Sequence, residues 1–84
     1  MDREKAIIIF NIEKRNFTVD LEVPLNITAN DLVNALNSAY ELGIDTSDIK
    51  NCYLKAENPI ALLKGNKTLG EFGVRNGSII NYTE

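Results

Sequence analysis

Hydrophobic and polar residues alternate strictly over residues 17–23, where the four odd-numbered positions are apolar and the three between them are polar. Because successive side chains of a strand point to opposite faces, this pattern predicts a β-strand with one buried face. Residues 5–12 are rich in β-branched residues, and a polar cluster at residues 13–16 separates the two runs. The pattern predicts a β-hairpin, which Pro24 ends because proline has no N–H for the ladder.

The hydrophobic period changes over residues 27–44, where apolar residues recur at intervals of three and four. They form one stripe of a helix, made of Leu32, Leu36, Ala39 and Tyr40. Thr28 can act as the N-cap, because its hydroxyl can accept a hydrogen bond from an N–H of the first turn. Gly43 supplies a left-handed residue that ends the helix. These signals predict one amphipathic helix, whose apolar face needs one sheet to cover it.

The elements after the helix are short. Residues 51–56 read as a third strand, and residues 60–64 as a brief edge strand. Residues 68–73 have the spacing of a capping box and predict a single helical turn. An Asn-Gly pair then favours a tight turn before a last strand at residues 78–83. This order predicts an α+β fold, in which a mixed sheet of four to five strands packs on one α-helix.

The helix stripe and the inward positions of the strands must face one another in such a fold. This predicts a core made of Ile8, Phe10, Ile12, Phe17, Val19, Leu21, Val23, Leu32, Leu36, Leu54, one of Leu62 and Leu63, Leu69, Val74 and Ile80.

Composition limits the size of the protein and the classes of partner. A chain of 84 residues is long enough for one small domain and too short for two, so residues 1–84 are expected to form a single domain. The net charge is −3, there is no histidine, and the basic residues are scattered. Such a chain has no cluster of positive charge that could bind nucleic acid or anionic lipid, so we expect a protein partner and no nucleic acid.

The expected compartment is the cytoplasm. Cys52 is the only cysteine, so no internal disulfide can form and a reducing setting is the simplest. The apolar run at residues 6–10 is too short for a signal peptide or a membrane span, so direct membrane insertion is not expected.

A search for catalytic chemistry yields no site. General acid-base and nucleophilic schemes rely on histidine or on clustered carboxylates, and here histidine is absent and the acids are spread along the chain. The glycines after residue 64 follow neither of the two phosphate-loop orders, and Asp45 and Asp48 lack the spacing of a calcium loop. We therefore expect neither an enzyme nor a protein that holds a cofactor or metal.

Two stretches resemble ubiquitin-like β-grasp proteins: Leu21-Glu22-Val23 before the helix, and Thr68-Leu69-x-Glu71-Phe72-Gly73-Val74-x-x-Gly77-x-x-Ile80 near the end. Within that superfamily, Leu63-Lys64-Gly65 through Leu69, followed by Gly73-Val74-x-Asn76-Gly77, looks most like the YukD/EsaB family associated with type VII secretion systems. The resemblance spans residues 5–83. It implies a ubiquitin-like β-grasp fold and an accessory role in the secretion apparatus, whereas the residue patterns alone imply a compact binding module.

Two functional classes fit such a fold. One is a protein-interaction module that is not conjugated. The other is a ubiquitin-like modifier or sulfur carrier, which acts through an activated C-terminal Gly-Gly on a flexible tail. The sequence ends Asn81-Tyr82-Thr83-Glu84, which disfavours the carrier unless the natural chain continues beyond residue 84.

The expected binding face lies on the side of the sheet away from the helix. The β-grasp resemblance implies that the first and last strands pair at the centre, with the third strand beside the last. If Ile8, Leu54 and Ile80 point to the helix, alternation turns their neighbours outward. The predicted apolar patch consists of Ile7, Ile9, Tyr53 and Ile79. The alternatives are that central strands simply favour isoleucine, or that a second copy covers the patch in a homodimer.

Overall fold

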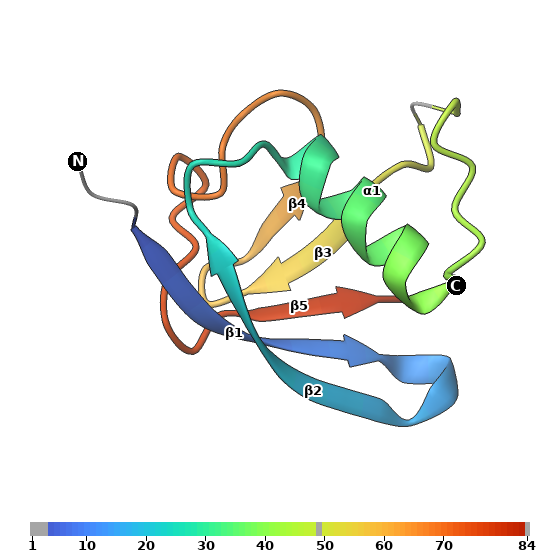
Figure 1. Ribbon diagram of the computed structural model, residues 1–84, viewed down its shortest axis with the longest axis horizontal. Coiled ribbons are helices and arrows are strands. Elements are labelled where there is room, and N and C mark those ends of the chain that lie inside the picture. The colour runs from blue at the N-terminus through green and yellow to red at the C-terminus, as the bar shows by residue number, and fades with distance from the viewer. Residues whose placement is uncertain (1–3, 49, 84) are drawn as a thin grey trace.

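The computed structural model describes residues 4–48 and 50–83. Its elements are β1 (Lys5–Ile12), a 3-10 turn (Glu13–Arg15), β2 (Phe17–Pro24), α1 (Ala29–Tyr40), β3 (Leu54–Glu57), β4 (Ala61–Leu63) and β5 (Ile79–Tyr82). The strands form one sheet in the order β2-β1-β5-β3-β4, with β1 and β5 parallel and the other neighbours antiparallel. Helix α1 packs on one face of this sheet (Figure 1). The predicted mixed sheet on one helix is confirmed.

Helix α1 begins where its capping residue predicts. The hydroxyl Oγ1 of Thr28 accepts a hydrogen bond from the N–H of Asp31 at 3.1 Å, which satisfies one of the free donors of the first turn. The buried face consists of Ala29, Leu32, Val33 and Leu36. The predicted stripe was wrong at Ala39, which is exposed, and it omitted Val33. A helix of 3.6 residues per turn drifts from a strict four-residue spacing, and Val33 lies on the side toward which it drifts.

The end of α1 also differs from the prediction. The helix stops at Tyr40, and the left-handed cap is Glu41, with φ of 53°, two residues before Gly43. The N–H of Leu42 then bonds the carbonyl of Asn37 at 3.2 Å. Leu42 is buried, so burial of this side chain accounts for the early turn out of the helix.

Arg15, in the turn between β1 and β2, caps the C-terminus of α1 from outside the helix. Its guanidinium donates to the carbonyl oxygens of Tyr40 at 2.7 Å and Glu41 at 2.8 Å. The last turn of the helix carries no basic residue of its own. A cation at this end compensates the negative pole of the helix and its free carbonyls, so the hairpin turn and the helix end are held together.

The core lies between α1 and the inner face of the sheet. Its fully buried large side chains include Phe10, Ile8, Ile12, Leu54, Leu63, Leu69, Ile80 and Val33. The choice between the two leucines of β4 is settled, because Leu63 is buried and Leu62 is 42% exposed. Buried residues that the sequence pattern did not predict are Ala6, Ala29, Val33, Leu42, Ala56, Ser78 and Asn81.

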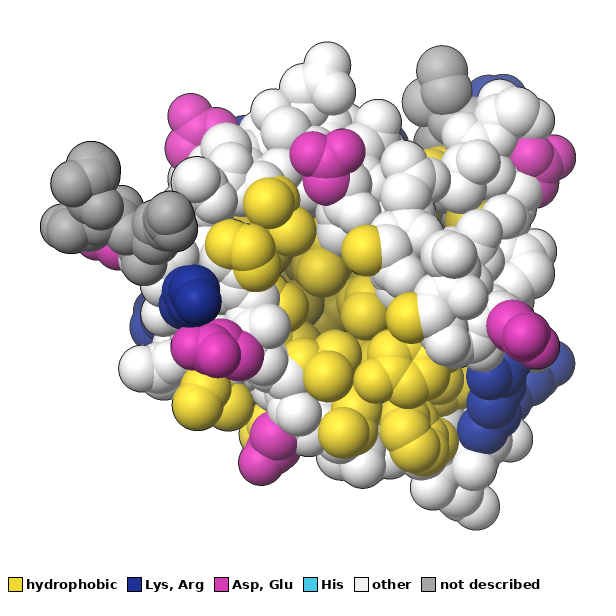
Figure 2. Space-filling view, viewed as in Figure 1, with side chains coloured by type: hydrophobic (Ala, Val, Ile, Leu, Met, Phe, Trp, Pro, Cys, Tyr) yellow, Lys and Arg dark blue, Asp and Glu magenta, His cyan; other side chains and the backbone are white. Residues whose placement is uncertain are grey.

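The first half of β2 was wrongly predicted to be buried. Phe17 is 37% exposed, and Val19 and Leu21 are only partly buried. β2 is an edge strand of the sheet, and Phe17 lies near the end of α1, where its ring packs on Tyr40 with centroids 5.6 Å apart. Apolar side chains consequently gather at the surface between α1 and β2 (Figure 2). Alternation identifies the inward face of a strand but not how far the helix extends over it.

The predicted capping box at residues 68–73 forms at a single turn, in which the N–H of Phe72 donates to the carbonyl of Thr68 at 3.1 Å. The N–H of Thr68 donates to Oε1 of Glu71 at 2.9 Å, and the N–H of Glu71 donates to Oγ1 of Thr68 at 3.2 Å. The hydrogen bond that the carboxylate of Glu71 accepts from the N–H of Thr68, and next the one from the Thr68 side chain, lower the pKa of Glu71 from its ordinary value of 4.5. A carboxyl whose pKa is lower in the folded state contributes stability above its ordinary pKa and loses that contribution as the pH falls through the folded value.

Candidate interaction surface on the outer face of the sheet

Three of the four predicted binding residues meet at the centre of the outer face. Ile9 and Ile79 are direct partners in the parallel pairing of β1 and β5. Ile7 lies two residues before Ile9 on the same face of β1 and is 54% exposed. Ile9 and Ile79 are partly buried. We call Ile7, Ile9 and Ile79 the isoleucine patch.

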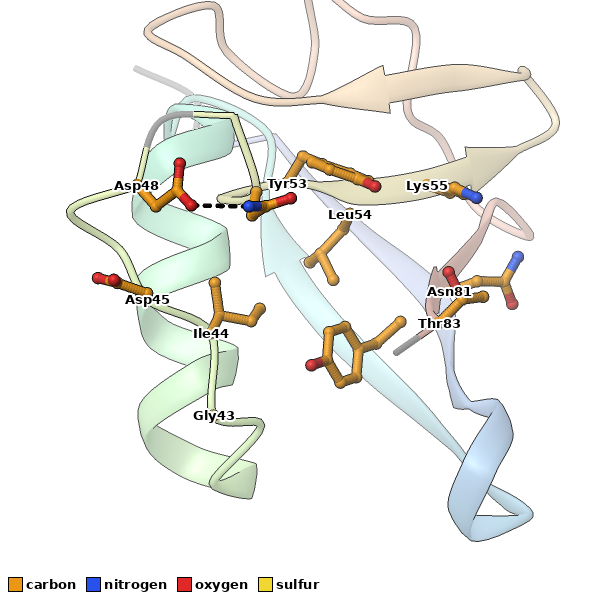
Figure 3. Close-up of a pocket in the computed structure, with 11 residues that line it drawn as sticks. Gly43, Ile44, Asp45, Asp48, Tyr53, Leu54, Lys55, Asn81 and Thr83 are labelled. Atoms are coloured by element: carbon orange, nitrogen blue, oxygen red, sulfur yellow. Dashed lines mark hydrogen bonds between the residues drawn. The ribbon is translucent and has the colours of Figure 1, made fainter.

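Tyr53 does not join this patch. It precedes β3, and it lies four residues before Glu57, the residue that pairs with Ile79. At the rise of a strand, four residues correspond to roughly 13 Å. Tyr53 instead lines a separate pocket of about 350 Å³ with Ile44 and Asp48, at the other end of β3 (Figure 3). The predicted four-residue patch is therefore reduced to three isoleucines.

A row of hydrogen-bonded polar side chains bounds the patch on the side toward Tyr53. Thr18 Oγ1 donates to Asn11 Oδ1 at 3.2 Å, and Asn11 Nδ2 donates to Asn81 Oδ1 at 3.1 Å. Asn81 Nδ2 then donates to Glu57 Oε2 at 2.8 Å. Asn81 is 6% exposed although it lies on the outer face, because it is enclosed by these neighbours. This network runs across β2, β1, β5 and β3 and marks where the apolar surface stops.

A second exposed apolar region lies at the β4 edge and was missed by the sequence analysis. Ile60 is 91% exposed and Leu62 is 42% exposed. Both line an open groove of about 530 Å³ together with Lys55 and Glu57 of β3. Strand β3, with the charged side chains of Lys55 and Glu57, therefore lies between this edge and the isoleucine patch. The sequence signal for this region was Ile60, an isoleucine that directly follows Pro59 and lies in a turn before β4, where its side chain is exposed.

Within residues 4–48 and 50–83, His, Cys, Asp and Glu side chains nowhere gather in a group of three that could hold a metal ion. No helix in the same residues is both long and apolar enough to cross a membrane.

Solved structures define the class of this fold. The ubiquitin-like domain of tubulin-binding cofactor B aligns with a TM-score of 0.77 at 19% identity, covering 99% of this chain and 92% of that one. The C-terminal ubiquitin-like domain of mouse tubulin-specific chaperone e gives 0.76 at 12% identity, covering 99% and 89%. The UBL domain of Plasmodium falciparum Dsk2 gives 0.60 at 16% identity, covering 93% and 97%. The protein has the ubiquitin-like β-grasp fold.

The family follows from the sequence itself. Residues 7–81 match the family model of YukD, described as a protein of the WXG100 protein secretion system (Wss). The chain belongs to the YukD family, as its resemblance indicated. No individual curated protein shows significant similarity to it.

Proposed function

We propose that this chain is a non-catalytic protein-interaction module of a WXG100, or type VII, secretion system, and that it acts in the cytoplasm without being conjugated. The observation that carries the proposal is the isoleucine patch at the centre of the sheet of a YukD-family protein. More than half of the surface of Ile7 is exposed to solvent, on the face of the sheet where α1 does not pack. Apolar surface grouped in this way is stabilised when a partner covers it.

The partner is expected to contact side chains rather than strand edges. Both strands that carry the patch lie inside the sheet, and each is paired on its two sides, so their backbone groups are already in ladders. Addition of a strand at this position is therefore excluded by the pairing. A partner covers the patch by packing on it from the outer face.

Replacing Ile9 and Ile79 together by aspartate tests the role of the patch. We expect Ile9→Asp/Ile79→Asp to abolish secretion of WXG100 proteins when it replaces the wild-type chain in cells, because two carboxylates would be buried against the partner. Ala35→Asp/Ser38→Asp is the matched control, since it adds the same charge on the exposed side of α1 and should secrete normally. Circular dichroism checks that both variants fold. Wild-type secretion by a folded Ile9→Asp/Ile79→Asp protein contradicts the proposal.

The alternative is a carrier that is activated at a flexible C-terminal tail. In the part that the structure describes, the segment at the end of β5 is held in place: the hydroxyl of Tyr82 donates to the carbonyl of Leu42 at 3.0 Å, and both Tyr82 and Thr83 are partly buried. We expect no adenylate or thioester when the protein is mixed with ATP and a ubiquitin-activating or sulfur-carrier-activating enzyme. Mass spectrometry checks this, with a known carrier as the positive control. Either adduct would favour the carrier class.

A further inference from the structure

Carboxylates flank the isoleucine patch on both sides across the sheet. Residues that pair directly in adjacent strands share a face, so the register places Asp20 beside Ile9, and Glu57 beside Ile79. One continuous row across four strands therefore reads Asp20, Ile9, Ile79, Glu57. In the next row Glu22 lies beside Ile7. All three carboxylates are exposed, and Glu57 is held on this face by the amide of Asn81.

The basic residues of this face lie elsewhere. Lys5 precedes Ile7 by two positions on β1, and Lys55 precedes Glu57 by two positions on β3. Lys5 therefore lies beyond one end of the patch, whereas Lys55 lies on the β3 side, in the row of Asn81 at the other end. Neither lies in the row that crosses the isoleucines. The β2 side of the patch carries two carboxylates, and on the β3 side Glu57 is the residue in line with the isoleucines.

A second copy of the chain that stacks with its strands aligned to those of the first does not fit this pattern. In a two-fold dimer that stacks isoleucine on isoleucine, the symmetry axis lies in the plane of the interface. If the axis follows the strands, Asp20 of one copy meets Glu57 of the other. If the axis crosses the strands, each carboxylate meets its own equivalent. Both arrangements bring like charges together in a desolvated contact, which is unfavourable.

The width of the row fits an α-helix. Asp20 and Glu57 are separated by three inter-strand spacings, or roughly 14 Å. An α-helix with its side chains is about 10–12 Å wide. A helix that lies along β1 and β5 can therefore rest an apolar stripe on the isoleucines, while longer cationic side chains on its two flanks reach the carboxylates.

We propose that the isoleucine patch binds an amphipathic helix of the partner whose apolar stripe is flanked by lysine or arginine. This inference rests on the proposed function and specifies the chemistry of the partner. Contact between the isoleucines and the apolar stripe removes apolar surface from water. The carboxylates beside the patch select a helix with cationic flanks and align its axis with the strands.

Two synthetic peptides test the charge requirement. Each is a helix of about 18 residues with the same leucine stripe, flanked by lysine in one peptide and by glutamate in the other. Calorimetry should show that the lysine peptide binds at least about tenfold more tightly than the glutamate peptide, and that raising NaCl from about 50 to 500 mM removes most of this difference. Equal affinities, or binding of neither peptide, would overturn the inference.

Variants of the protein separate local from overall charge. Asp20→Asn/Glu22→Gln/Glu57→Gln keeps side-chain size and the acceptor for Asn81, and should bind the lysine peptide about tenfold more weakly. The control is Asp31→Asn/Glu41→Gln/Asp45→Asn, which makes the same change in net charge away from the patch and should bind like the wild type. Equal weakening by both triple variants would show a general charge effect and overturn the inference.

Secretion separates this inference from the function on which it rests. If Ile9→Asp/Ile79→Asp abolishes secretion and the triple variant at Asp20, Glu22 and Glu57 secretes as wild type, the interaction module stands and the basic helix is rejected. Loss of secretion in both folded proteins, with normal secretion by the control triple variant, supports both.

Discussion

Replacing Leu63 by alanine is expected to lower the free energy of unfolding by roughly 2–5 kcal/mol, while the same replacement at Leu62 should cost less than about 1 kcal/mol. The two leucines are neighbours in β4, but Leu63 is fully buried opposite Leu54, and Leu62 is 42% exposed on the outer face. The buried side chain loses its transfer free energy and leaves a cavity. The exposed one loses only part of its contacts.

Urea denaturation of the two variants measures the difference directly, provided that the slopes of the transitions are equal. Because chemistry, strand and chain position are nearly the same, the comparison isolates burial. Similar losses for Leu62→Ala and Leu63→Ala would mean that the inward face of β4 is assigned incorrectly.

Ser78→Ala is expected to cost roughly 2–3 kcal/mol, although it removes a single oxygen atom. Ser78 is fully buried, and its Oγ donates to the carbonyl of Asn58 at 2.6 Å and accepts from the N–H of Arg75 at 3.0 Å. Alanine leaves both backbone groups without this partner. The hydroxyl thereby joins the turn before β4 to the turn before β5.

The matched control is Ser38→Ala on the exposed side of α1. This change should leave stability unchanged or raise it by a few tenths of a kcal/mol, because alanine favours a helix more than serine does. Thermal and urea unfolding of both variants test the comparison. A loss below about 0.5 kcal/mol for Ser78→Ala would show that water replaces the hydroxyl at no cost.

Local patterns were sufficient to predict the architecture. The alternation in β2, the helical period with Thr28 as its cap, and the capping box at Thr68 each depend on interactions within a few residues. The burial of Phe17 could not be predicted in this way. Exposure of its ring depends on where α1 ends relative to β2. That end involves Leu42, which is 25 positions from Phe17, and the contact of the helix end with Arg15 joins two parts of the chain that are distant in sequence.

The candidate site was predictable where it depends on alternation and topology alone. Ile7, Ile9 and Ile79 meet because β1 and β5 pair in parallel, as the fold resemblance implied. Tyr53 was misplaced because its distance from Ile79 depends on the register of β3, which begins at Leu54 after an irregular loop. The acidic sides of the patch could be found only from the observed register of β2 on β1 and of β3 on β5.

The central position of β1 and β5 has a consequence for synthesis. Strand β1 takes as its parallel neighbour β5, which is made much later, since Ile9 and Ile79 are 70 positions apart in the sequence. The hairpin and α1 can form early, but the inner edge of β1 stays without a partner until Ile79–Tyr82 have emerged. Contacts between such distant parts of a chain slow folding, and an unpaired strand edge can associate with other chains. The growing chain therefore carries an open sheet edge from the synthesis of β1 until β5 is inserted beside it.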